Sequence, residues 1–182
     1  NKDRSTQVKT TPIDLAPFRH LYPFKSRYAD VNGFRMHYVD EGRGAPVIML
    51  HGNPTWSFYF RELIQGLSSR YRAVAPDHIG CGLSDTPRSC AYAYRLKNRV
   101  DDLEALLAHL GLTRDITLVL HDWGGMIGMA YASRYPERIS RLVLLNTAAF
   151  PLPAQAIFPA AQLGSALEAG ESLLGRHRGR EA

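Results

Sequence analysis

Short apolar segments alternate with helical segments along this chain, and that alternation limits its fold more than any other feature of the sequence. Each apolar run has the length and composition of a strand that is buried on both faces. Parallel strands need helical crossovers between them, so the pattern predicts an α/β sheet with helices on both faces. The expected strands span 45–52, 71–82, 115–122 and 139–150, and the expected helices span 57–68, 95–110 and 126–135.

The other segments fit a single domain that has an arm and a tail. Residues 1–27 form a polar, Pro-containing arm, and alternating apolar positions around an Asn-Gly pair predict a hairpin within 27–42. Residues 151–182 are rich in Ala, Gly and Arg and do not return to the strand pattern. We therefore expect the sheet domain over 28–150, followed by an atypical tail.

Composition excludes several classes of function. Hydrophobic residues make up 45% of the chain and charged residues 21%, which is an ordinary globular balance. The net charge of +5 comes from scattered Lys and Arg without a basic stripe, so we expect no nucleic-acid partner. No apolar stretch approaches the roughly 20 residues of a membrane span, and the N-terminus does not resemble a signal peptide. With two cysteines and no disulfide framework, the protein is expected in the cytoplasm.

The third expected strand ends in a carboxylate. The sequence LVLHDWGG places Asp122 between this strand and the next helix, with Gly124 two residues later. Such a turn exposes one side chain at the top of the sheet and directs the N–H groups of the helix N-terminus toward a ligand. Gly124 is expected because the helix must pass close to the strand. We predict that Asp122 is a nucleophile, which suits displacement at saturated carbon and leaves an alkyl ester on the enzyme.

Two hydrogen-bond donors are expected opposite Asp122. Asn53 follows a neighbouring strand within HGNP and offers an amide, and Trp123 offers an indole N–H. Two donors that face one carboxylate form a site for an anionic leaving group, and the backbone N–H groups of the same residues form an oxyanion hole. His51 and Gly52 are expected to support this loop. We expect no cofactor and no metal.

Three motifs resemble the aspartate-nucleophile branch of the α/β-hydrolase fold: HGNPTW at 51–56, PDHIGCGLSD at 76–85 and HDWGG at 121–125. Haloalkane dehalogenases share the first and last of these motifs. PDHIGCGLSD, together with LVLLNTAAF at 142–150, is more similar to the cis-β-lactone decarboxylases of bacterial olefin biosynthesis. The resemblance covers about residues 20–150.

The resemblance implies a mechanism and a substrate class. In the decarboxylases, the residue that matches Asp122 engages a four-membered lactone, and carbon dioxide leaves to give an alkene. In the dehalogenases it attacks the carbon that carries the halogen, and the residues that match Asn53 and Trp123 hold the halide. Both imply a small hydrophobic substrate, and the olefin pathway implies a multienzyme assembly. Epoxide hydrolases share HDWGG but usually have an aromatic residue in place of Asn53.

The resemblance also implies a general base and an acid that we do not find in this chain. Hydrolysis of an alkyl ester needs a histidine held by an acid. The one histidine after the nucleophile, His177, does not follow a strand, and Asn146 and Thr147 leave no acid where some dehalogenases carry Glu. We expect the nucleophile half of the enzyme, ending before the cap and last strands through truncation, a frameshift near residue 151 or a partial gene.

Each of these residues also has a structural interpretation. Asp122 is a candidate turn residue, Asn53 a candidate turn cap, and His51 a candidate packing or loop-bonding residue. Asp77 is expected to fix its loop through local hydrogen bonds. Cys81 is expected to be an unreactive loop residue because no cationic neighbour is evident. Two function classes therefore stay open: an enzyme that forms an alkyl-enzyme ester, and a catalytically inactive domain.

Overall fold

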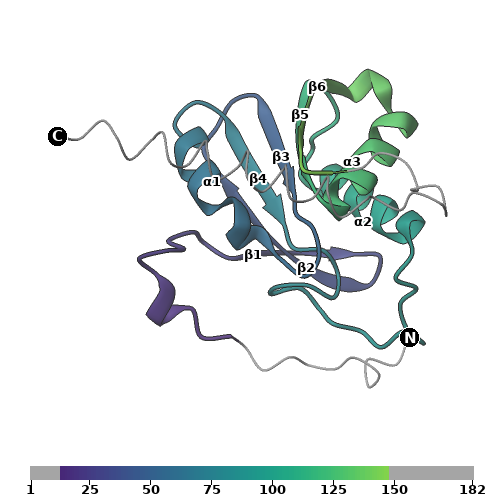
Figure 1. Ribbon diagram of the computed structural model, residues 1–182, viewed down its shortest axis with the longest axis horizontal. Helices are drawn as coiled ribbons and strands as arrows, with labels where there is room; N and C mark the ends of the chain where they lie inside the picture. The colour runs from purple at the N-terminus through teal and green to yellow at the C-terminus, as the bar shows by residue number, and fades with distance from the viewer. Residues whose placement is uncertain (1–12, 148–182) are drawn as a thin grey trace, which may run out of the picture. The chain divides into compact units, whose positions relative to one another are not determined.

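The computed structural model describes residues 13–147. They form a six-stranded sheet with the order β1-β2-β4-β3-β5-β6 (Figure 1). β2 pairs antiparallel with β1 and β4, whereas β4, β3, β5 and β6 run parallel to one another. This architecture confirms the predicted α/β fold class. The strands are β1 (Arg27–Val31), β2 (Phe34–Glu41), β3 (Pro46–Leu50), β4 (Arg72–Pro76), β5 (Ile116–His121) and β6 (Ile139–Leu145).

The predicted hairpin is present as β1 and β2. Asn32 and Gly33 connect the two strands with φ values of 52° and 87°. A two-residue hairpin turn of type I′ requires positive φ at both positions, and Asn-Gly meets that requirement best. The Gly33 N–H also donates a hydrogen bond to the Asp30 carboxylate at 3.1 Å.

Helices cover both faces of the sheet (Figure 1). α3 begins at Trp123 rather than at the expected residue 126. Gly124 and Gly125 therefore belong to its first turn and not to a loop. Glycine is needed at both positions because a Cβ atom there would collide with other parts of the chain. None of the helices within 13–147 is long and apolar enough to cross a membrane. The helices are η2 (Ala16–Phe18), η3 (Ser57–Phe60), α1 (Arg61–Leu67), α2 (Leu96–His109), α3 (Trp123–Arg134) and η4 (Pro136–Arg138).

The alternating side chains of β3 divide the core into two layers. Ile48 and Leu50 pack in the cluster that contains the apolar faces of α2 and α3. Val47 and Met49 point to the opposite face and pack with α1. All four are buried, which agrees with the prediction of a strand covered on both sides.

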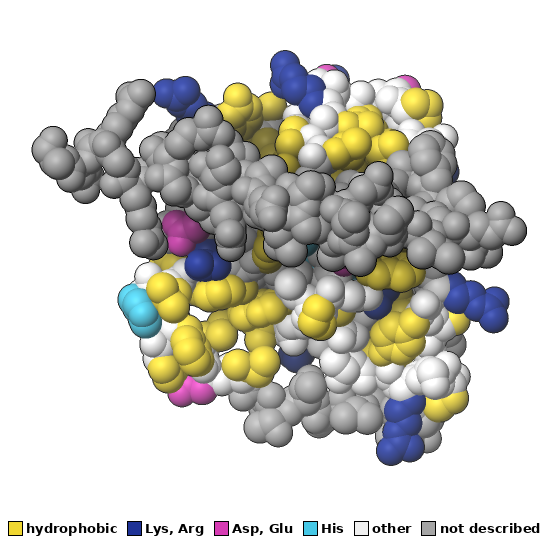
Figure 2. All heavy atoms as spheres, viewed as in Figure 1, with side chains coloured by type: hydrophobic (Ala, Val, Ile, Leu, Met, Phe, Trp, Pro, Cys, Tyr) yellow, Lys and Arg dark blue, Asp and Glu magenta, His cyan; other side chains and the backbone are white. Residues whose placement is uncertain are grey.

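β6 differs from its prediction. The sequence predicted a buried strand, but Leu142, Val143, Leu144 and Leu145 are between 38% and 51% exposed. Within the described residues β6 pairs with β5 alone, so it forms an edge of the sheet. Hydrophobic side chains lie at the surface in the upper part of Figure 2, over the region where Figure 1 labels β6 and α3. The prediction of burial was wrong here because side-chain composition does not say whether a strand has a second neighbour.

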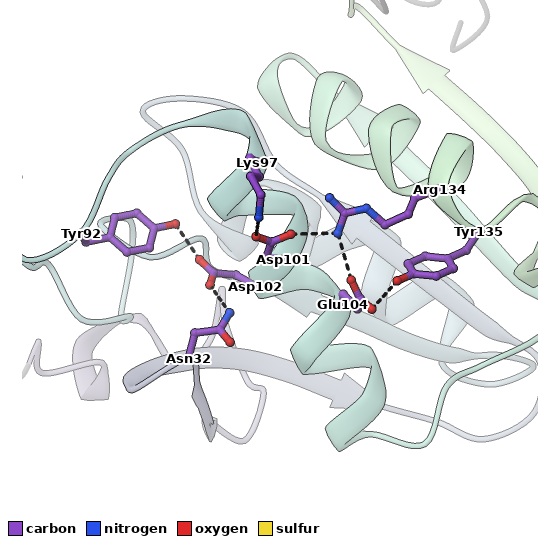
Figure 3. Close-up of polar contacts among 8 residues, drawn as sticks. All are labelled: Asn32, Tyr92, Lys97, Asp101, Asp102, Glu104, Arg134 and Tyr135. Atoms are coloured by element: carbon purple, nitrogen blue, oxygen red, sulfur yellow. Dashed lines mark hydrogen bonds and ion pairs between the residues drawn. The ribbon is translucent and has the colours of Figure 1, made fainter.

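A buried carboxylate connects the hairpin to α2 (Figure 3). Asp102 is only 3% exposed. It accepts one hydrogen bond from the Asn32 amide at 2.8 Å and another from the Tyr92 hydroxyl at 2.6 Å. Burial raises the pKa of Asp102, and these two donors oppose that change. The network therefore holds the β1–β2 turn, the loop before α2 and α2 itself in one arrangement.

A second network connects α2 to α3 at the surface (Figure 3). Arg134 on α3 binds Asp101 at 2.8 Å and Glu104 at 3.0 Å, both on α2. Lys97 adds an ion pair with Asp101 at 2.6 Å, one turn away on the same helix. These side chains are 31% to 78% exposed, so water weakens their attraction.

We expect Asp102→Ala to lower the free energy of unfolding by about 2–3 kcal/mol, because it leaves the two donors of a buried network without an acceptor. Asp101→Ala is the matched control on the same helix, and its loss should stay below about 1 kcal/mol because its ion pairs are exposed. Urea denaturation of both variants measures the difference. Equal losses would contradict the assignment of Asp102 as the structural carboxylate.

Candidate active site

Asp122 occupies the turn between β5 and α3. Its backbone has φ 51° and ψ −124°, outside the regions that L-residues favour. The following helix lies very close to β3, because a Cβ atom on Gly124 would be 2.0 Å from the carbonyl oxygen of Leu50. The chain therefore makes a sharp strand-to-helix turn that only glycine at position 124 permits. This turn presents the Asp122 carboxylate at the carboxyl end of the sheet.

Asn53 contacts that carboxylate from the loop that follows β3. Its backbone N–H donates a hydrogen bond to Asp122 Oδ2 at 3.0 Å. A Cβ atom on Gly52 would lie 2.2 Å from the same oxygen, so glycine is required for this close approach. β3 and β5 are neighbours in the sheet, which is why residues 69 positions apart meet here.

A cavity of about 230 Å³ opens beside Asp122. Trp123, the first residue of α3, is 46% exposed and forms part of its wall. Met126 adds a second apolar side chain, and Asn146 and Thr147 line the cavity from the end of β6. A small apolar molecule in this cavity would lie against the carboxylate. The structure thus brings the Asn53 backbone to Asp122 from the loop after β3, while Trp123 follows Asp122 directly as the first residue of α3.

His51 and His78 form a buried pair behind the Asn53 loop, with ring centroids 4.2 Å apart. His51 Nδ1 donates to the carbonyl of Gly52 at 2.8 Å, and its Nε2 accepts the N–H of His78 at 3.0 Å. His78 Nε2 returns a bond to the carbonyl of His51 at 3.1 Å. Burial lowers the pKa of both imidazoles. Each ring is therefore neutral at pH 7 and supports the loop with one defined tautomer.

Asp77 organises the adjacent loop from a fully buried position. It accepts the N–H of Leu83 at 2.9 Å, the N–H of Ser57 at 2.8 Å and His37 Nδ1 at 2.9 Å. Burial raises the pKa of Asp77, but these bonds outweigh burial and the pKa is lowered. The local bond to Leu83 agrees with the sequence prediction. The bonds to Ser57 and His37 had no signal in the sequence because they join segments 20 and 40 residues away.

Cys81 lies in the same loop and contacts the side chain of Asn53. Its thiol is 3.7 Å from Asn53 Oδ1. The expectation that no cation lies near Cys81 was wrong, because α2 brings the Arg99 guanidinium beneath this loop, where it donates to the carbonyl of Ile79. Burial nevertheless raises the pKa of the thiol, and Arg99 opposes that change only in part. The thiol is therefore protonated at pH 7 and acts as a weak donor.

The described residues place no histidine against the Asp122 carboxylate. His121 precedes it but stacks on Tyr59, with ring centroids 4.3 Å apart. His177 lies outside the described residues. After β6 the chain has Asn146 and Thr147 rather than an acid, and the Thr147 hydroxyl donates to the backbone carbonyl of Asp122 at 2.6 Å. No pattern in the sequence indicated that contact.

Comparison with known proteins matches residues 45–177 to the family described as alpha/beta hydrolase fold. The chain is 61% identical over 133 residues to the cis-3-alkyl-4-alkyloxetan-2-one decarboxylase of Shewanella oneidensis and 51% identical over 146 residues to that of Xanthomonas campestris pv. campestris. It is 44% identical over 139 residues to haloalkane dehalogenase 2 of Mycobacterium tuberculosis. These matches cover 73%, 76% and 76% of this chain but 42%, 49% and 48% of the relatives. The chain therefore spans about half the length of the curated relatives it matches.

Solved structures show the same fold in related enzymes. Epoxide hydrolase VrEH1 from Vigna radiata has a TM-score of 0.67 and 36% identity, over 78% of this chain and 46% of that protein. Haloalkane dehalogenase DatA from Agrobacterium tumefaciens C58 has a TM-score of 0.63 and 36% identity, over 68% of this chain and 41% of that protein. The fold is thus shared between enzymes that open epoxides and enzymes that remove halogens.

We expect Gly124→Ala to lower the free energy of unfolding by about 2–3 kcal/mol, because its methyl group would collide with the backbone of β3. Gly66→Ala is the control, because Gly66 also lies within a helix and no atom lies within 4 Å of the new methyl group. Both variants share the gain in helix propensity from Gly to Ala, so the loss for Gly66→Ala should be at least about 1 kcal/mol smaller. Thermal or urea unfolding measures the two losses. The close approach at Leu50 would be refuted by equal losses.

The lowered pKa of Asp77 predicts a stability contribution that depends on pH. The contribution is complete above the ordinary carboxyl pKa of about 3.9 and disappears as the pH falls through the lower folded value. Asp77→Asn should therefore unfold at lower urea concentration at pH 7 and lose less stability than the parent chain between pH 5 and pH 3. Parallel stability curves for the two proteins would show that Asp77 is not the titrating group.

Proposed function

Because the chain belongs to the alpha/beta hydrolase fold family, we propose that it carries the nucleophile of an enzyme that decarboxylates cis-3-alkyl-4-alkyloxetan-2-ones. The observation that carries the proposal is the position of Asp122, at a strained strand-to-helix turn with its Oδ2 bound by the Asn53 N–H at 3.0 Å. The identity of 61% to a decarboxylase of this name supports the choice of substrate.

The first step is displacement at the ring carbon that carries the lactone oxygen. An Asp122 carboxylate oxygen attacks C4 of the oxetan-2-one, and the C4–O1 bond breaks with its electron pair on O1. The product is an alkyl ester of Asp122 whose C3 carries a free carboxylate. No proton moves in this step, so it requires an anionic nucleophile and donors for the released carboxylate.

The second step releases the alkene. The electron pair of the bond between C3 and the carboxylate forms the C3=C4 double bond, carbon dioxide leaves, and Asp122 departs from C4 as a carboxylate. Displacement inverts C4, and elimination with the two leaving groups on opposite sides then returns the cis arrangement of the two alkyl groups. A cis lactone therefore gives a cis alkene, and the nucleophile is restored without water.

The donors around Asp122 have separate tasks in this proposal. The Asn53 backbone N–H stabilises the Asp122 oxygen on which negative charge develops as Asp122 leaves C4. The Trp123 indole N–H and the Asn53 side-chain amide are the donors we assign to the substrate carboxylate that forms when the lactone opens. The apolar walls of Trp123 and Met126 suit a small hydrophobic substrate. A cytoplasmic location and a multienzyme assembly remain predictions from the sequence.

Hydrolytic dehalogenation is the second candidate, favoured by 44% identity to a mycobacterial haloalkane dehalogenase. There the same Asp122 displaces a halide and forms an alkyl ester, but water must then cleave the ester with help from a general base. Epoxide opening would use the same nucleophile, as the likeness to VrEH1 suggests. The two alternatives differ from decarboxylation in requiring water for turnover.

We expect the chain, incubated with a cis-3,4-dialkyl oxetan-2-one, to form an adduct of the lactone's full mass on Asp122 or to release a cis alkene. Intact mass spectrometry and gas chromatography measure the two products. Asp122→Asn should abolish both because an amide is a far weaker nucleophile. Asp115→Asn is the matched control, since Asp115 also has a left-handed backbone, with φ 55°, and lies at the other end of β5.

The outcomes separate the candidates. A 1-bromoalkane that alkylates Asp122 faster than the lactone does would favour the dehalogenase. A folded chain that yields neither adduct nor alkene from either reagent would refute nucleophilic function and leave the inactive domain. An adduct that persists in Asp122→Asn would assign the chemistry to another residue.

A further inference from the structure

The geometry points to Thr147 as a positioning residue for Asp122: its hydroxyl fixes the nucleophile's backbone so that the carboxylate meets the Asn53 N–H. The role of Asp122 in this inference rests on the proposed function, whereas the contact itself does not. Thr147 does not act on substrate in this assignment. It acts through the backbone of Asp122.

The register of the sheet places Thr147 beside the nucleophile turn. His121, the last residue of β5, pairs with Leu145, the last residue of β6. Each strand is followed by a residue with positive φ: Asp122 follows β5 with φ 51°, and Asn146 follows β6 with φ 44°. Two adjacent parallel strands thus end in left-handed turns at the same level, and Thr147 lies next to the Asp122 carbonyl as a result.

The Asp122 carbonyl accepts two hydrogen bonds. Thr147 Oγ1 donates at 2.6 Å, and the Gly125 N–H donates at 2.9 Å from the first turn of α3. A Cβ atom on Gly125 would lie 1.7 Å from Thr147 Oγ1, so the hydroxyl occupies space that only glycine leaves open. Both observations place the hydroxyl inside the turn rather than toward solvent.

This contact controls the carboxylate because Asp122 lies in a region of φ and ψ that a non-glycine residue adopts only when its surroundings hold it there. The Gly125 bond belongs to α3 and holds the carbonyl from the helix. The Thr147 bond is the one that holds it from β6. Without the hydroxyl, only the bond from α3 holds the carbonyl, and we expect the strained turn to relax and to carry Oδ2 away from the Asn53 N–H.

The test compares Thr147→Val, which keeps the branched shape and removes the hydroxyl, with Thr147→Ser, which keeps the hydroxyl. Hydrogen exchange of the Asn53 amide in the ¹⁵N-labelled full chain reports the bond to Asp122 directly. Thr147→Val should speed this exchange by about tenfold relative to the buried Leu118 amide, which reports global unfolding. Thr147→Ser should exchange as the parent chain does.

Reactivity gives a second readout. With a cis-3,4-dialkyl oxetan-2-one, Thr147→Val should lower the maximal rate of adduct formation at Asp122 by about tenfold with little change in the half-saturating concentration, because orientation and not binding is lost. Thr147→Ser should restore the parent rate. If the parent chain itself yields neither adduct nor alkene, the proposed function fails, and amide exchange alone still decides the role of Thr147.

Two results would overturn the inference. One is unchanged Asn53 exchange in a folded Thr147→Val variant. The other is equally fast exchange in Thr147→Ser, because it would assign the effect to the lost methyl group. If Thr147→Val does not fold, Thr147→Ala replaces it, and exchange at the parent's rate in that variant overturns the inference in the same way.

Discussion

The left-handed turn at Asp122 is the constraint on which the rest of this structure depends. A non-glycine residue with φ 51° and ψ −124° costs about 1–3 kcal/mol and persists only where the surrounding fold imposes it. Here the fold imposes it from three sides. β5 delivers the residue to the end of the sheet, α3 starts immediately after it, and Gly124 lets that helix lie against the Leu50 carbonyl. The same turn that strains the backbone is the one that exposes the carboxylate.

The loops after β3 and β4 complete the arrangement from behind. Their supporting groups are buried and keep fixed protonation states: His51 and His78 stay neutral, and Asp77 stays ionised because three donors surround it. They hold the Asn53 loop without offering a competing acid or base at the cavity. The supporting groups thus lie behind the loops, and the Asp122 carboxylate lies at the carboxyl end of the sheet, where open α/β sheets generally bind ligands.

The sequence was sufficient for most of the fold because hydrophobic spacing and turn residues act locally. The hairpin at Asn32-Gly33, the buried strands β3 to β5 and the position of Asp122 all follow from short segments. Predictions failed where the answer depends on a distant neighbour. The exposure of β6 depends on its having only β5 beside it among the described residues, and the Arg99 charge near Cys81 depends on how α2 packs.

The chemistry around Asp122 also separates the candidate reactions by the groups that each one needs. Dehalogenation and epoxide opening end with an ester that water must cleave, and that cleavage needs a general base. Decarboxylation restores Asp122 by elimination, so its bond changes call on the carboxylate, the Asn53 N–H and donors such as Trp123. All of these reactions begin with the same displacement, in which the Asp122 carboxylate attacks carbon while the Asn53 N–H binds its Oδ2. The described site therefore suits the first step of each, and the choice of the lactone as the proposed substrate rests on the sequence identity.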